Sequence, residues 1–129
     1  MSGDVGSSLV EFAMMSGLLV FILFAVLQIA ALFFVRSVVS SAAADGARYG
    51  SSVGSNPDEG AARASNLIER ALSRAMALRV PCTGEVAIDP PTGLAVTRVR
   101  CAGRIESILF TIGAIVTVDS TGQSLEERP

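Results

Sequence analysis

The hydrophobic pattern divides the chain into one long apolar run and a remainder in which apolar and polar positions alternate. No charged residue occurs from Phe12 to Val35, and the run is interrupted only at Ser16, Gly17 and Gln28. At about 1.5 Å per residue, a helix of this length spans a hydrocarbon layer about 30 Å thick. We therefore expect a single transmembrane helix over residues 12–35.

The helical pattern continues beyond this span. Small and β-branched residues recur at spacings of three and four, which places them on one helix face. They are Val35, Val38, Val39, Ala42, Ala43, Gly46, Ala47 and Gly50. Such a face allows close packing, either against the protein's own head or against a neighbouring subunit. We expect one helix over residues 7–53, with Ala42, Ala43, Gly46 and Ala47 as its packing stripe.

A second, amphipathic helix is expected to start at Asn56. Asparagine is a good N-cap, Pro57 suits the first helical position, and two acids follow in the first turn. Pro81 would end this helix. Its expected buried stripe is Ile68, Ala71, Leu72, Ala75 and Leu78. Its expected solvated face is Arg63, Asn66, Arg70 and Arg74, and Glu59 is spaced to pair weakly with Arg63.

A β-hairpin is expected from residues 85–88 and 94–100, which flank a Pro- and Gly-containing turn at 89–93. This hairpin brings the only two cysteines, Cys82 and Cys101, nearly opposite each other, close to disulfide distance. A disulfide in an oxidising compartment and a pair of reduced buried thiols both fit. Residues 115–119 form a third candidate strand, residues 105–110 are ambiguous, and residues 121–129 are expected to fray.

These elements predict an α+β fold. It consists of a long N-terminal transmembrane helix that extends out of the membrane, a second amphipathic helix, and a small head with an antiparallel hairpin or sheet. The head is expected to occupy residues 56–129.

The amino-acid composition argues against several classes of function. The 129 residues include no His, and the ten basic residues form no run in a chain of net charge −2. Zinc sites and His-based nucleophilic triads are therefore excluded, and nucleic-acid binding has no electrostatic footprint. The glycine-containing loop at 50–60 lacks the Lys-Ser/Thr ending of a phosphate-binding loop. We expect no enzymatic activity, no cofactor, no metal and no nucleic-acid partner.

One acidic residue, Glu11, lies at the start of the apolar run. An ionised carboxylate at membrane depth costs several kcal/mol unless a partner meets it. A carboxylate that snorkels to the interface without a partner is the simpler alternative. A glycine, Gly6, stands five positions earlier.

Gly6, four further residues, Glu11 and Phe12 resemble the processing site of prepilins, which a membrane peptidase cuts after the glycine. Residues 40–49 resemble the small-residue segment of TadE-like proteins, which are minor pilins or pseudopilins of tight-adherence (Flp, type IV) pilus systems. The resemblance implies a leader over residues 1–6 and cleavage between Gly6 and Ser7. It also implies a prepilin peptidase, other pilin subunits and the pilus secretion machinery as partners.

The resemblance leads to an expected mechanism. Cleavage would give Ser7 an ammonium group one helical turn from Glu11. A pair between that ammonium and Glu11 of the same or a neighbouring subunit would set the register of packed helices, because an out-of-step subunit leaves a buried charge unpaired.

The resemblance and the expected disulfide favour a single-pass protein of the bacterial inner membrane with its N-terminus inside and its C-terminus outside. Its head would then remain outside, at the tip of an extracellular pilus or along it. The positive-inside rule, applied to Arg36 and Arg48 alone, predicts the opposite orientation. Two other functions stay open. One is an unprocessed membrane-tethered interaction protein, and the other is a secreted protein whose signal peptide is cut after Ala42-Ala43-Ala44.

Overall fold

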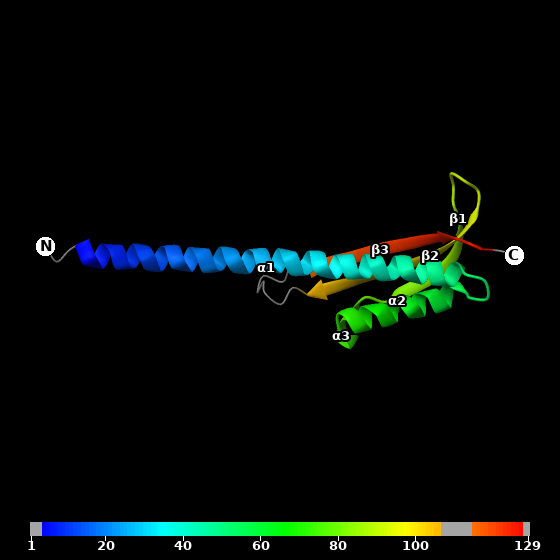
Figure 1. Ribbon diagram of the computed structural model, residues 1–129, viewed down its shortest axis with the longest axis horizontal. Coiled ribbons are helices and arrows are strands. Elements are labelled where there is room, and N and C mark those ends of the chain that lie inside the picture. Colours follow the sequence, from blue (N-terminus) through cyan, green and yellow to red (C-terminus); the bar gives the residue numbers. More distant parts are fainter. Residues whose placement is uncertain (1–3, 107–114, 128–129) are drawn as a thin grey trace. The chain divides into compact units, whose positions relative to one another are not determined.

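The computed structural model describes residues 4–106 and 115–127 (Figure 1). Its elements are α1 (Asp4–Ser51), α2 (Pro57–Ala71), α3 (Arg74–Arg79), β1 (Cys82–Ile88), β2 (Ala95–Glu106) and β3 (Ile115–Leu125). The strands form one antiparallel sheet in the order β1-β2-β3. A long apolar helix, further helices and a small sheet confirm the predicted α+β class.

The chain divides into two compact units, residues 1–33 and 34–129, and α1 passes from one to the other. The apolar side chains of the first unit are mostly uncovered; Leu19 and Phe21, for example, are each 71% exposed. Among the described residues, α1 is the helix long and apolar enough to cross a membrane. A bilayer is the environment in which such an uncovered apolar helix is stable.

The second helix begins as predicted but ends early. The backbone N–H of Glu59 donates to the Asn56 side chain at 2.9 Å, and Pro57 is the first helical residue. The prediction that this helix reaches Pro81 is wrong, because α2 ends at Ala71 and α3 starts after Ser73. The Ser73 hydroxyl accepts a hydrogen bond from the Met76 N–H at 3.1 Å. This local cap competes with continuation of the helix.

The break also changes which side chains are buried. Ile68 is fully buried and Leu72 is partly buried, as predicted. The predicted burial of Ala71, Ala75 and Leu78 is wrong, since all three are exposed. For Ala75 and Leu78 the reason is that the helical period ends at Leu72, whereas Ala71 lies within α2 on its exposed side. The buried face of α2 is instead Gly60, Ala61, Ala64 and Ile68, whereas Arg63, Asn66, Arg70 and Arg74 are exposed as predicted.

The predicted hairpin is present, and both flanking strands are longer than expected. Cys82 pairs directly with Cys101, and Ile88 pairs with Ala95. The predicted third strand is also present, but the expected fraying of residues 121–125 is wrong, because β3 pairs with β2 as far as Leu125. Of the ambiguous segment 105–110, residues 105–106 belong to β2, and the rest lies outside the described residues, as do residues 128–129.

The core of the second unit lies between one face of the sheet and the helices. The predicted α1 stripe contributes Val39, Ala42, Ala43 and Ala47, and these residues cluster with Ala64, Ile68, Val80, Val99, Cys101 and Val118. The Gly122 backbone of β3 approaches the Ala43 backbone of α1, and Gly84 of β1 approaches Pro57 of α2. The α1 stripe therefore packs against the protein's own head, which was one of the two expected partners.

Candidate functional site

Gly6 has no packing role within the described part of the chain. It lies inside α1, and a Cβ atom at this position would meet nothing within 4 Å. A glycine in a helix costs about 0.5–1 kcal/mol relative to alanine. The packing of the described residues thus gives no reason for glycine at position 6.

Glu11 has no basic side chain of its own unit to pair with. Ser7 and Glu11 are four positions apart on α1, so they share one helix face, and both are exposed. Phe12, next in sequence, is 71% exposed. Residues 4–33 contain no Arg or Lys. Residues 4–33 therefore supply no basic side chain for Glu11.

A second polar group lies within the span. The side-chain oxygen of Gln28 is buried and has no hydrogen-bond partner within the described part of the chain. In a bilayer, such a carboxamide is satisfied most readily by a polar group of a neighbouring helix. Glu11 at the start of the span and the side-chain oxygen of Gln28 within it are thus two polar groups that residues 4–33 leave without a partner side chain.

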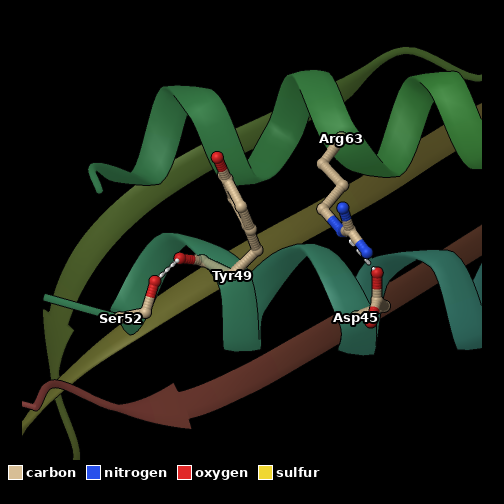
Figure 2. Close-up of polar contacts among 4 residues, drawn as sticks. All are labelled: Asp45, Tyr49, Ser52 and Arg63. Carbon is tan, nitrogen blue, oxygen red and sulfur yellow. Dashed lines mark hydrogen bonds and ion pairs between the residues drawn. The ribbon is translucent and has the colours of Figure 1, made fainter. Parts of the chain in front are cut away.

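One arginine of α2 contacts two residues of the segment 40–49 of α1. Arg63 Nε donates to Asp45 Oδ2 at 2.7 Å, and the guanidinium carbon lies 5.1 Å from the centre of the Tyr49 ring (Figure 2). The predicted pairing of Arg63 with Glu59 is not among the described ion pairs; Arg63 binds Asp45 instead. The Arg63 and Asp45 side chains are 48% and 44% exposed, so this contact stabilises the head by at most about 1 kcal/mol.

The same segment allows the two helices to touch. A Cβ atom on Gly46 would lie 2.5 Å from the Gly60 carbonyl oxygen, and Ala43 and Ala47 are fully buried. Sequence analysis found Gly46 but missed Gly60 as its partner on α2, and it missed Asp45 as the partner of Arg63. The available signal was Gly60 itself, a glycine within a helix that needs no left-handed backbone there.

The two cysteines form a disulfide that joins β1 to β2. The Sγ atoms of Cys82 and Cys101 are 2.04 Å apart, and the two residues are separated by 19 positions. Cys101 is fully buried in the core. The bond fastens the start of the hairpin at the pair that sequence analysis identified.

Exposed cross-strand ion pairs are a further feature of the sheet. Arg100 binds Asp119 through two nitrogen atoms, one of them Nε at 3.0 Å from Oδ1. The hydrogen bonds from Arg100 lower the pKa of Asp119. On the β1 side of β2, a guanidinium nitrogen of Arg98 lies 3.6 Å from a carboxylate oxygen of Glu85. Within the described ranges, no three His, Cys, Asp or Glu side chains are grouped so that they could hold a metal ion.

Comparison with known proteins agrees with the N-terminal pattern. Residues 6–48 match the family model of TadE-like proteins. The TadE-like segment thus starts at Gly6, contains the whole apolar span, and ends within the part of α1 that packs against the head. It includes Glu11, Gln28, Asp45 and Gly46. No curated protein and no solved structure showed a significant match to the chain.

Proposed function

We propose that this protein is a TadE-like minor pilin or pseudopilin, a membrane-anchored subunit for assembly of a tight-adherence pilus. The observation that carries the proposal is the match to the TadE-like family model. It starts at Gly6 and includes a helix whose apolar side chains are exposed. That helix serves first as the membrane anchor and then as a component of a helical bundle. The head has a structural or binding role rather than an enzymatic one.

Proteolytic processing would supply a positively charged partner for the Glu11 carboxylate. A prepilin peptidase would cut between Gly6 and Ser7 and create an ammonium group at Ser7. Because Ser7 and Glu11 share one helix face, the ammonium of one subunit can pair with Glu11 of its own chain or of a neighbour. In an apolar bundle, an axial slip would leave a charge unpaired at a cost of several kcal/mol. Gln28 would gain a hydrogen-bond partner in the same bundle.

The Gly6–Ser7 bond lies within α1, which begins at Asp4. A protease binds its substrate in an extended conformation, so the first turns of α1 must unwind before cleavage. Gly6 weakens the helix at this point and leaves room for a close approach of the enzyme.

We further propose that the protein resides in the bacterial inner membrane with its N-terminus inside and its head outside. The Cys82–Cys101 disulfide supports this orientation, because such bonds persist in oxidising compartments. Alkaline phosphatase fused to the C-terminus should be active in intact cells, whereas a fluorescent protein that folds only in the cytoplasm should stay dark at the same position. The reverse pattern would overturn the orientation.

The signal-peptide alternative conflicts with the packing of the head. A cut after Ala44 would remove Val39, Ala42 and Ala43, and each of these is at most 2% exposed in the core. A secreted head would thus lose a large part of its helical cover. An unprocessed, tethered interaction protein remains the second candidate, because it keeps the whole of α1.

N-terminal sequencing of the protein purified from membranes of cells with the pilus system separates these functions. We expect the mature chain to begin at Ser7. A chain that retains Met1 would support the unprocessed tether, and a chain that begins at Asp45 would indicate a signal peptide.

Assembly is tested separately. Glu11→Ala should leave membrane insertion intact and strongly reduce piliation, whereas Ser16→Ala, a change on the same helix, should leave both unchanged. Normal piliation of Glu11→Ala would remove the proposed role of the carboxylate.

A further inference from the structure

One end of the unit formed by residues 34–129 is basic. Five arginines with exposed side chains lie there, and they come from all three helices and from one strand. They are Arg36 of α1, Arg70 of α2, Arg74 and Arg79 of α3, and Arg104 of β2. We refer to this surface as the basic end. It is the end at which the chain enters the unit from the membrane span.

The packing of their neighbours places these arginines together. Val35, Leu72, Ala77 and Ile105, each within two residues of one of them, pack against the same core cluster. The backbone of Gly103 lies against Arg79. Within this unit, α3 and the end of β2 lie at the same end along its long direction (Figure 1). The ends of the elements that carry these arginines therefore lie at one end of the unit. Arg104 is on the face of the sheet away from the helices, because its neighbour Ile105 packs against the core.

The arginines of the basic end take part in no ion pair within the described part of the chain. The described ion pairs use Arg63, Arg98 and Arg100, and none of them involves an arginine of the basic end. Only two acids, Glu69 and Glu106, belong to the same ends of their elements.

The other end of the unit is acidic. The Glu127 N–H binds the carbonyl oxygen of Ser51, where α1 ends. Asp58 and Glu59 begin α2 at this end, and Asp89 lies in the turn between β1 and β2. Arg48 in the last turn of α1 is also at this end, but the acids named here outnumber it, so the charge of the head is polarised along its length.

An uncovered apolar side chain accompanies the charges. Leu78 is 76% exposed, more than any other large apolar residue of the head among those described. It lies on the short helix α3, between Arg74 and Arg79. Exposed leucine flanked by arginines is typical of segments that lie in the membrane interface, where apolar groups enter the acyl boundary and basic groups meet headgroups.

We propose that the basic end docks on anionic phospholipid headgroups of the membrane that α1 spans. Chain connectivity supports this occupant, because Arg36 immediately follows Val35, the last residue of the uncharged run. Arg36 would therefore lie near the headgroups when α1 spans a bilayer. Charge complementarity then favours contact with an anionic surface. The proposal rests on membrane insertion of α1 and goes beyond the pilus role.

The test uses the full chain in lipid nanodiscs and a tryptophan reporter. The native sequence contains no Trp, so Leu78→Trp introduces a single reporter into the basic end. The matched control is Val53→Trp, because Val53 is 66% exposed and lies in the loop after α1, at the opposite end. Lipids with brominated acyl chains quench the fluorescence of a tryptophan only when it reaches the bilayer.

In nanodiscs with about 30% phosphatidylglycerol, quenching of the Leu78→Trp reporter should be at least about twofold stronger than in pure phosphatidylcholine. High salt should abolish the difference, because it screens exposed charges. The Val53→Trp reporter should show little quenching in either lipid. Equal quenching of the Leu78→Trp reporter in both lipids, or quenching that salt leaves unchanged, would overturn the proposal.

Charge variants away from the reporter complete the test. Arg70→Gln/Arg104→Gln removes two positive charges of the basic end without changing α3, and it should reduce the lipid-dependent quenching by at least half. The control Arg48→Gln/Arg98→Gln removes the same charge elsewhere and should preserve it. If both pairs act alike, only net charge matters and docking through the basic end is wrong. N-terminal processing is unaffected in either case, so the outcome is independent of the pilus function.

Discussion

A Cβ atom on Gly46 in α1 would lie 2.5 Å from the carbonyl oxygen of Gly60 in α2. The two helices therefore touch through their backbones at this point, and neither position has room for a side chain. The same contact brings Asp45 within reach of Arg63, one turn further along α2. The small residues of the TadE-like segment thus have a packing role in this protein, because they allow the head to pack closely against α1.

Gly46→Ala should separate the two helices and lower the free energy of unfolding of the head by about 1–3 kcal/mol, as overpacking of a dense core does. The measurement is urea unfolding in detergent, followed by circular dichroism. Gly17→Ala is the matched control, because a Cβ atom there meets nothing within 4 Å. A loss of equal size in both variants would show that the change acts on the helix rather than on the Gly46–Gly60 contact.

Arg63→Gln should cost about 1 kcal/mol of head stability, because the variant loses both the exposed ion pair with Asp45 and the contact with the Tyr49 ring. A double-mutant cycle with Asp45→Asn isolates the ion pair, for which we expect a coupling below about 1 kcal/mol. Arg70→Gln, on the same helix but without a described ion pair, should be nearly neutral. A neutral Arg63→Gln would mean that the contact contributes nothing to stability.

Thr97→Val should stabilise the head by about 1 kcal/mol. The Thr97 side chain is fully buried, and its hydroxyl has no hydrogen-bond partner within the described residues, so the folded state bears the cost of desolvating it. The reciprocal change Val99→Thr, two positions along the same strand and equally buried, should destabilise by about 1–3 kcal/mol. Destabilisation by Thr97→Val would indicate that the hydroxyl is satisfied, for example by water.

Cys82→Ala/Cys101→Ala should lower the free energy of unfolding by about 3 kcal/mol, because the disulfide restricts the unfolded chain over a separation of 19 residues. Reduction of the native protein should have a similar effect. A thiol-blocking gel-shift assay on protein from untreated cells reports whether the bond is present. Two freely blocked thiols would mean that the cysteines are reduced, and the main support for an external head would be lost.

Acid should weaken the pair between Arg100 and Asp119. The hydrogen bonds from Arg100 hold the pKa of Asp119 below its ordinary value. The carboxylate therefore contributes stability above its unfolded-state pKa of about 4, and this contribution is lost as the pH falls through the lower folded-state value. An NMR titration should show a depressed pKa for Asp119, which Arg100→Gln should return toward the ordinary value. An unchanged titration in Arg100→Gln would exclude Arg100 as the cause.

Several features of the fold could be predicted because their signals are local. The length of the uncharged run predicts a helix long and apolar enough to cross a membrane, and α1 is such a helix. Asn56 followed by Pro57 starts a helix through the chemistry of its own first turn. The turn at 89–93 sets the hairpin, and the hairpin brings Cys82 opposite Cys101. In each case the residues that carry the signal are neighbours in sequence or are separated by one short turn.

Other features depended on distant parts of the chain and could not be predicted. The continuation of β3 to Leu125 depends on pairing with a β2 strand that is itself longer than expected. Glu59 was nearer to Arg63 in sequence, but Asp45, 18 residues away, became its partner. The periodicity of the sequence carries no information about the distant residues that determine these outcomes.

By itself, the sequence determined that the protein has a helix of membrane-spanning length and a small α+β head. It also showed one acid, Glu11, at the start of the apolar run, within a segment that resembles prepilins. The tertiary structure decided that the stripe at 42–47 packs against this head, that Gly46 meets Gly60, and that five arginines gather at one end. The reason is physical. Apolar length and capping act within a few turns of chain, whereas close packing and surface charge depend on which distant segments fold side by side.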